Sequence, residues 1–133
     1  MRGVIADTGP LYATYDKSDS FHSIACQQLE TLSQSNLSVI VPYPVLLESH
    51  SLILKRLGIS AASRFIEEIN QGADLINLTI EDYQQAQQFL QRFPDQSITL
   101  FDASTAILSG RLSLPIWTYD RHFDIMRTIV WRN

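Results

Sequence analysis

The chain has 133 residues, 45% of them hydrophobic and 18% charged, with a net charge of −4, which predicts one soluble globular domain spanning residues 1–133. No stretch approaches the roughly 18 apolar residues of a membrane span, no secretory signal opens the chain, and the single cysteine, Cys26, excludes a disulfide framework, which together favour a reducing cytoplasm. The negative charge does not exclude nucleic acid as a partner, because four acids gathered in one metal site would leave the remaining surface neutral.

The first expected element is a strand over Gly3–Ala6, an apolar run without a polar interruption. Such a run favours a strand covered on both faces, as at the centre of a parallel sheet. Asp7 follows directly, at the carboxyl end of the strand, which is where ligands bind in open α/β sheets. The alternative is that Asp7 or Thr8 caps a short helix that begins near Pro10.

The rest of the chain alternates between helical and strand patterns. Apolar residues at three- and four-residue spacing from Phe21 to Leu32 predict an amphipathic helix. Further helices are expected at Val45–Leu57, Ser60–Gln71, Ile80–Phe93 and Ser97–Gly110, with a short helical turn after Tyr119. Further strands are expected at Leu37–Val41, Ala73–Leu78, Ile116–Thr118 and Thr128–Trp131. This alternation predicts a three-layer α/β/α sandwich around a mostly parallel sheet of four or five strands.

Four carboxylates lie in apolar runs, whereas the other acids of the chain lie in polar stretches typical of a solvated surface. The four are Asp7, Glu48, Asp102 and Asp120. Burying an isolated carboxylate costs several kcal/mol unless it is paired, hydrogen-bonded or bound to a metal. Lysine and arginine lie mostly in polar stretches, and only Lys55 and Arg56 offer a nearby cation, to Glu48. The pattern favours convergence of the four acids at one edge of the sheet.

Clustered carboxylates repel one another, and hard divalent cations that prefer oxygen ligands relieve this repulsion. Such a site suits phosphodiester chemistry, because a metal ion lowers the pKa of an attacking water and a second one stabilises the leaving oxygen. For each acid taken alone, a helix cap or a buried ion pair is an equally good explanation. Four such explanations in one small domain are harder to accept together.

Four segments of the sequence, in this order and spacing, resemble the PIN-domain family. They are Ile5–Ala13 (IADTGPLYA), Val45–Leu52 (VLLESHSL), Asp95–Ile107 (DQSITLFDASTAI) and Trp117–Asp124 (WTYDRHFD). Each is weak alone, but the set spans the chain and includes an Asp-Thr pair after the first strand and a Thr-x-Asp-x-x-Phe motif. The chain departs from the family pattern in Tyr119, where a smaller residue is common, and in the bulky Trp117.

The resemblance implies a compact α/β/α nuclease that hydrolyses single-stranded RNA with Mg²⁺ or Mn²⁺. Asp7, Glu48, Asp102 and Asp120 match the acidic metal-binding positions, with Asp124 as a possible fifth, and Thr8 and Thr118 match hydroxyl positions beside them. Small members of this family are commonly VapC-type toxins of VapBC toxin–antitoxin pairs, usually homodimers inhibited by a small antitoxin. Other members act in RNA maturation, so a housekeeping or non-catalytic RNA-binding module, whose acids mainly hold a partner, is the alternative.

Other candidate chemistries have less support. The chain contains no Gly-x-Ser-x-Gly motif for a serine hydrolase and no glycine cluster for a nucleotide-binding loop. Its histidines match no zinc spacing, and Cys26 fits a filler role in a helix. Candidates for phosphate contacts are the basic or ionisable side chains Lys55, Arg56, Arg111, Arg121 and His122, although each also fits ordinary surface charge. Ser104 and Thr105 fit either the site or helix packing.

Overall fold

The computed structural model describes residues 2–132, which form a four-stranded parallel sheet with helices on both faces. The strands are β1 (Gly3–Ala6), β2 (Ser38–Pro42), β3 (Asp74–Ile76) and β4 (Ile116–Trp117), in the order β3-β2-β1-β4. The helices are α1 (Thr8–Tyr15), α2 (His22–Gln34), α3 (Tyr43–Leu57), α4 (Ile59–Gly72), α5 (Ile80–Leu90), α6 (Leu100–Leu112) and α7 (His122–Ile125). The three-layer α/β/α architecture is confirmed.

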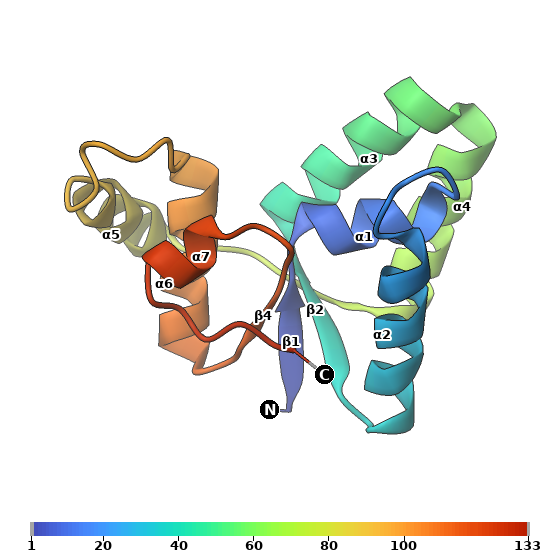
Figure 1. The fold of residues 1–133 in the computed structure, drawn as a ribbon, viewed down its shortest axis with the longest axis horizontal. Helices are drawn as coiled ribbons and strands as arrows, with labels where there is room; N and C mark the ends of the chain where they lie inside the picture. Colours follow the sequence, from blue (N-terminus) through green and yellow to red (C-terminus); the bar gives the residue numbers. More distant parts are fainter. Residues whose placement is uncertain (1, 133) are drawn as a thin grey trace.

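Alternate residues of β1 face opposite layers of the core. Val4 and Ala6 pack with the side chains of α1 to α4, whereas Ile5 packs with those of the α5, α6 and α7 side. Figure 1 shows the same division, with α1 to α4 on one side of the strands and α5 to α7 on the other. All four residues of β1 are buried, which confirms the prediction of a strand covered on both faces.

Gly3 is required by the close approach of β1 to β2. A Cβ atom at this position would lie 2.4 Å from the carbonyl oxygen of Ser38, and real Cβ contacts are not that short. Gly58 is the other glycine with a conformational reason, because it ends α3 with a φ of 98°, a value that side chains disfavour. The predicted end of this helix at Leu57 is therefore confirmed.

Several predicted elements have other boundaries in the structure, and one predicted strand is missing. Strand β3 covers Asp74–Ile76 rather than Ala73–Leu78. Helix α6 begins at Leu100 rather than Ser97, because Thr99 caps it by accepting a hydrogen bond from the backbone of Asp102. Helix α5 ends at Leu90 rather than Phe93. Thr128–Trp131 is not a strand; it contributes a single parallel bridge, between Ile116 and Val130.

Helix α2 buries less of its apolar face than its spacing predicts. Only Ala25 and Leu32 are buried, whereas Phe21, Ile24 and Leu29 are exposed. The periodicity was typical of a core helix, but the neighbouring layer covers only part of the helix. Among residues 2–132, no helix has both the length and the apolar composition needed to cross a bilayer.

The strand order places a topological switch point between the neighbouring strands β1 and β4, where the connections of the chain lead away in opposite directions. From β1 the chain proceeds through β2 to β3 on one side, and it then returns to place β4 on the other side of β1. The segments that follow β1 and β4 therefore lead to opposite faces, α1 on one and α7 on the other. Crevices at the carboxyl ends of strands at such a switch point are common ligand sites.

Candidate functional site

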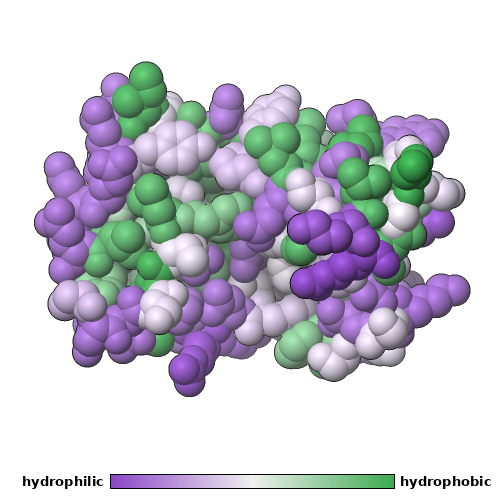
Figure 2. Space-filling model, turned by 90° about the horizontal axis from the view of Figure 1, so that it is seen from above, coloured by the Kyte–Doolittle hydropathy of each residue, from purple (hydrophilic) through white to green (hydrophobic). Residues whose placement is uncertain are grey.

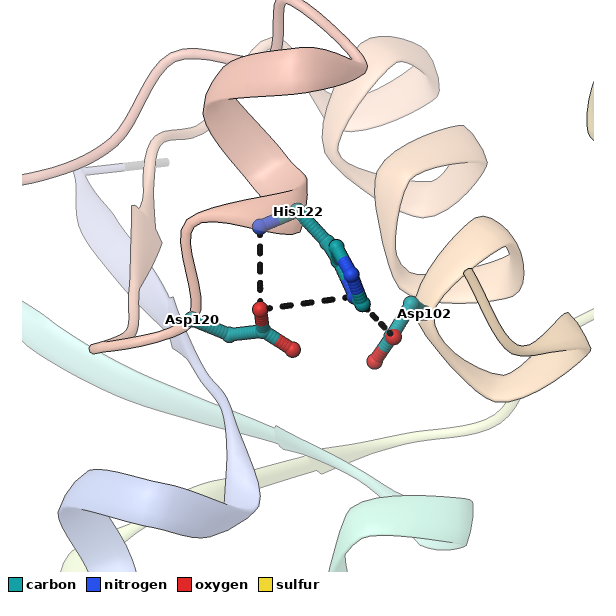
Figure 3. Close-up of side chains that lie close together, drawn as sticks. All are labelled: Asp102, Asp120 and His122. Carbon is teal, nitrogen blue, oxygen red and sulfur yellow. Dashed lines mark hydrogen bonds and ion pairs between the residues drawn. The ribbon is translucent and has the colours of Figure 1, made fainter. Parts of the chain in front are cut away.

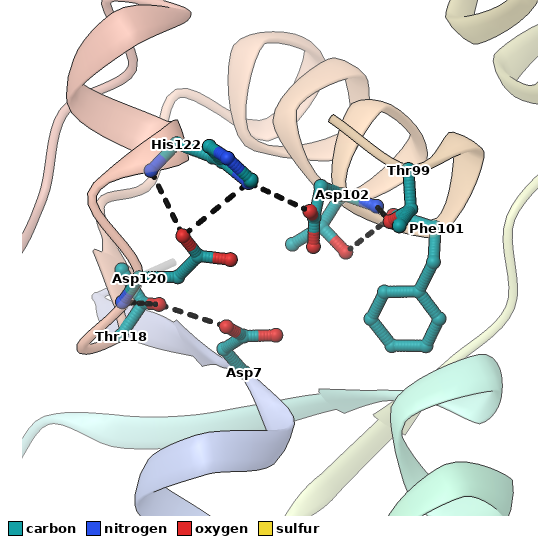
Figure 4. Close-up of polar contacts among 8 residues, drawn as sticks. Asp7, Thr99, Phe101, Asp102, Thr118, Asp120 and His122 are labelled. Atoms are coloured by element: carbon teal, nitrogen blue, oxygen red, sulfur yellow. Dashed lines mark hydrogen bonds and ion pairs between the residues drawn. The ribbon is translucent and has the colours of Figure 1, made fainter. Parts of the chain in front are cut away.

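Asp7 lies at the switch point, immediately after β1. Its backbone N–H donates to the carbonyl of Trp117 in β4 at 3.0 Å, so the two strand ends hold it from both sides. Its side chain does not cap α1, which excludes that alternative. The carboxylate instead accepts a hydrogen bond of 2.8 Å from the Thr118 hydroxyl (Figure 4). Only 7% of Asp7 is exposed.

Burial raises the pKa of Asp7 from 3.8 to about 6. The hydrogen bonds from Thr118 and from the backbone of Thr8 oppose this shift, and the nearby charges of Asp102 and Asp120 add to it. Within residues 2–132, no lysine or arginine forms a salt bridge with Asp7. The carboxylate is therefore held in a site where its negative charge is poorly compensated.

A series of hydrogen bonds orders the loop between β4 and α7. The Thr118 hydroxyl, which donates to Asp7, also accepts from the backbone N–H of Asp120 at 3.0 Å. The carboxylate of Asp120 in turn accepts from the backbone N–H of His122 at 2.9 Å. Figure 4 shows Thr118 between the two acids. Thr118 thus lies beside the acids and holds the carboxylate of Asp7.

Asp102 faces this loop from the first turn of α6, which Thr99 caps. The Nδ1 atom of His122 lies 3.6 Å from the Oδ2 of Asp102 and 3.5 Å from the Oδ1 of Asp120 (Figure 3). That nitrogen is buried and makes no hydrogen bond. One donor atom from each of the three residues lies within 4.8 Å of the others, so this cluster is able to hold a metal ion.

All four predicted acids line one open cleft of about 600 Å³. Glu48 reaches it from α3, across from α6, and is exposed, unlike the buried Asp7. Figure 2 looks down on the carboxyl edge of the sheet, where hydrophilic side chains lie between hydrophobic ones on either side. Thr8 also lines the cleft, and its buried hydroxyl has no hydrogen-bond partner within residues 2–132.

The donor set fits a divalent cation. Oxygen ligands from several carboxylates are what Mg²⁺ and Mn²⁺ prefer, and a cation would compensate the charge of Asp7 that no arginine or lysine compensates. Two buried polar atoms of the cleft, Thr8 Oγ1 and His122 Nδ1, also make no hydrogen bond within residues 2–132. Buried polar atoms are rarely left unsatisfied, so a ligand or an ordered water in the cleft explains them.

The other predicted site residues divide between the cleft and its surroundings. Arg56 lines the cleft, with its guanidinium 5.3 Å from the ring centre of Tyr12. Lys55 and Arg121 are exposed and lie outside the cleft lining. Asp124 is also outside it and pairs at the surface with Arg132, at 3.0 Å.

Three further predictions concern residues outside the cleft lining. Arg111 is not free for phosphate, because its guanidinium binds both carboxylate oxygens of Asp82, at 2.9 and 2.8 Å. Asp82 is itself buried, which corrects the prediction that every acid outside the set of four is solvated. Ser104 and Thr105 donate to the carbonyl of Phe101 in their own helix, so they belong to helix packing.

Sequence reasoning missed two features of the cleft. It treated His122 as a phosphate contact, although its place two residues after Asp120 was a signal that it would lie beside the acids. It placed Phe21 on the apolar face of a helix, whereas Phe21 and Tyr119 line the cleft. The polar segment before Phe21 was the only sequence signal that this ring precedes the helix.

No family model matches the sequence. The chain is 30% identical to Ribonuclease VapC26 from Mycobacterium tuberculosis over 129 residues, which cover 95% of this chain and 93% of the relative. The solved structure of VapC20 from Mycobacterium tuberculosis, titled a sarcin-ricin loop cleaving toxin, superposes with a TM-score of 0.83 at 20% identity, covering 98% of this chain and 100% of that one. VapBC2 from Rickettsia felis, bound to a promoter DNA fragment, gives 0.77 at 13% identity, covering 98% and 97%.

Proposed function

Because the chain belongs to the VapC family of PIN-domain toxins, we propose that it is a metal-dependent ribonuclease that hydrolyses single-stranded RNA. The proposed catalytic and metal-binding residues are Asp7, Glu48, Asp102 and Asp120, with Mg²⁺ or Mn²⁺ as the cofactor. Thr8 and Thr118 support them. His122 is added as a nitrogen donor beside Asp102 and Asp120.

One observation carries this proposal: Asp7 is buried, its pKa is raised to about 6, and its carboxylate faces other acids without a compensating arginine or lysine within residues 2–132. A fold keeps such a group only at a cost, since the charged form is poorly solvated. Perturbed carboxylates that line a cleft are typical of functional sites. The names of two similar proteins, a ribonuclease and a sarcin-ricin loop cleaving toxin, support RNA as the substrate.

When bound, a divalent cation supplies Lewis-acid chemistry, lowering the pKa of an attacking water and stabilising the charge that develops on the leaving oxygen. The residues of the chain provide the geometry. Thr118 fixes the carboxylate of Asp7 by donating to it and fixes the Asp120 loop by accepting from its backbone. Asp102 is held at the first turn of a capped helix, so its position is equally well defined.

Three further assignments follow from the family and stay proposals. A small antitoxin is the expected protein partner, supported by the solved relative VapBC2, whose name covers both members of such a pair. A homodimer is expected as well, and the exposed apolar side chains Leu47, Ile59 and Ile129 are available for protein contacts. The cytoplasm is the expected location.

The test compares Asp102→Asn with Asp124→Asn. Purified proteins are incubated with single-stranded RNA and either Mg²⁺, Mn²⁺ or EDTA, and the products are separated by size. Asp102→Asn is expected to abolish cleavage, whereas Asp124→Asn, which removes an acid outside the cleft lining, is expected to cleave as the wild type does. Cleavage by wild type in EDTA, or by Asp102→Asn, would contradict the proposal. RNA binding without cleavage by the wild type would favour the non-catalytic alternative.

A further inference from the structure

Two stacked aromatic rings form part of the cleft wall. The ring centres of Phe21 and Tyr119 are 4.5 Å apart and their planes differ by 14°. Both residues line the cleft that contains the four acids. Phe21 nevertheless remains 43% exposed, although an apolar ring gains free energy by leaving water. The protein thus holds a flat apolar surface in solvent beside its acidic site.

Hydrogen bonds hold the Tyr119 ring and the backbone that carries Phe21. The backbone N–H of Phe21 donates to the side chain of Asp19 at 2.8 Å, which sets the turn that leads into α2. The Tyr119 hydroxyl donates to the side-chain oxygen of Gln28 at 2.6 Å, and the Trp117 indole donates to the same oxygen at 2.8 Å. The Phe21 ring stacks on the anchored Tyr119 ring before any ligand binds, and a preorganised surface loses less conformational entropy on binding.

The same two rings also line a second depression, of about 310 Å³. Arg121 lines this depression and is exposed, and Asp120 lines both the depression and the cleft. The rings therefore adjoin both the acidic cleft and a depression that contains a basic side chain. An RNA strand that crosses the rings has a surface for base stacking and a nearby cation for a phosphate.

We propose that Phe21 and Tyr119 form a stacking platform for an unpaired RNA base next to the cleaved phosphate. This inference rests on the proposed function, since it takes the acidic cleft as the place where RNA is cut. Unpaired bases stack on aromatic side chains in single-stranded RNA complexes, and every base offers a flat face. The platform tolerates many sequences but requires an unstacked base, so it selects single-stranded over duplex substrates.

The experiment separates binding from cleavage by using the Asp102→Asn protein, which is not expected to cut. A short single-stranded RNA carries a fluorescent adenine analogue whose emission is quenched by stacking. Affinity and quenching are measured for Phe21→Leu, which keeps an apolar side chain without a ring, and for Phe21→Trp, which keeps a stacking surface. Tyr43→Ala serves as the control, because Tyr43 is similarly exposed, at 41%, but does not line the cleft.

We expect Phe21→Leu to lower the affinity by about 5- to 150-fold and to abolish the quenching. Phe21→Trp should restore both, and Tyr43→Ala should change neither. In the cleavage-competent background, Phe21→Leu should raise KM more than it lowers kcat. An RNA with one abasic position should bind the protein with Phe21 more weakly by the same factor. It should bind Phe21→Leu no more weakly than the intact RNA does, because the two changes remove the same interaction.

Two results would overturn the platform. The first is unchanged RNA affinity in Phe21→Leu, which would leave the pair as a surface for a protein partner. The second is that the losses of binding free energy from Phe21→Leu and from an abasic position add up fully, wherever along the RNA the abasic position is placed. That result would show that no base contacts the ring. If the wild type fails to cleave any RNA, the proposed function fails instead, and the quenching data distinguish that case. Melting temperatures of each variant confirm that it is folded.

Discussion

Asp7 and Asp82 are both buried aspartates, yet they have opposite surroundings. Asp82 accepts two hydrogen bonds from the Arg111 guanidinium and one from the backbone of Thr79, and Arg111 lowers its pKa. Asp7 has the Thr118 hydroxyl but no such cation among residues 2–132, and burial raises its pKa to about 6. Burial alone therefore does not separate the acid of a structural ion pair from the acid that we propose to bind metal; the compensating charge does.

The largest difference between the two acids should appear in catalysis. Asp7→Asn keeps the shape of the side chain but removes the negative charge, so cleavage should fall by about a thousandfold or more. Asp82→Asn should cleave normally for each folded molecule, because Asp82 lies outside the cleft lining. Initial rates on single-stranded RNA, normalised to the folded fraction, measure both. Equal losses in the two variants would remove the distinction between them.

The second difference is in how stability depends on pH. The pKa of Asp7 is raised in the folded state, so protonation of Asp7 favours folding. This contribution to the free energy of unfolding is complete below pH 3.8 and is lost as the pH rises through about 6. The loss is about 3 kcal/mol by pH 7 without metal. It is measured as the difference in free energy of unfolding between wild type and Asp7→Asn, both in EDTA, so that other carboxylates cancel.

Mg²⁺ should reverse this loss at neutral pH through mass action, because it binds the ionised carboxylates of the folded protein. The wild-type melting temperature should therefore rise with Mg²⁺ more at pH 7.5 than at pH 5. Asp82→Asn should show the same rise, and Asp7→Asn should show less. A wild-type melting temperature that does not respond to Mg²⁺ or Mn²⁺ would count against the metal site.

A smaller effect is expected when the structural pair is broken. Asp82→Ala leaves the Arg111 guanidinium without its partner and removes the cap on the backbone of Thr79. The expected loss of stability is about 1–3 kcal/mol, below that of a fully buried pair, because the Arg111 side chain is 42% exposed. Urea unfolding measures it. A loss of Mg²⁺ binding in this variant would show that the two acids are not independent.

The smallest effect concerns the hydroxyl that serves Asp7. Thr118→Val removes the donor to Asp7 and the acceptor for the backbone of Asp120, at a cost of about 1 kcal/mol in unfolding free energy. The affinity for Mg²⁺ should fall about tenfold, since residues that orient metal ligands act at this scale. Thr118→Ser should behave as the wild type does. Calorimetric titration with Mg²⁺ compares the three proteins.

Local signals were sufficient for most of the fold. The apolar run of β1 predicted its burial, and the structure confirms the predicted end of α3 at Leu57 and the predicted start of α5 at Ile80. The Thr128–Trp131 segment has a strand-like composition, but only the bridge between Ile116 and Val130 forms. Strand formation depends on a neighbouring edge as well as on composition, and the sequence does not specify that edge.

The site was predicted in part for the wrong reason. Asp7 and Asp102 are buried as their apolar neighbours suggested, but Glu48 is exposed, and so is its apolar neighbour Leu47, at 66%. Its place in the cleft comes from the position of α3 rather than from burial. Asp82 was missed because its partner Arg111 is 29 residues away, and no local spacing reveals such a pair.

The pairing of β4 with β1 has a consequence for the synthesis of this protein. The Thr118 hydroxyl that binds Asp7 lies 111 residues further along the chain. A nascent chain therefore lacks Thr118, Asp120 and His122 until the segment that follows β4 has emerged and docked beside β1. Under the proposed function, truncated products that stop before residue 116 would hold three of the four predicted acids of the cleft and would not cleave RNA.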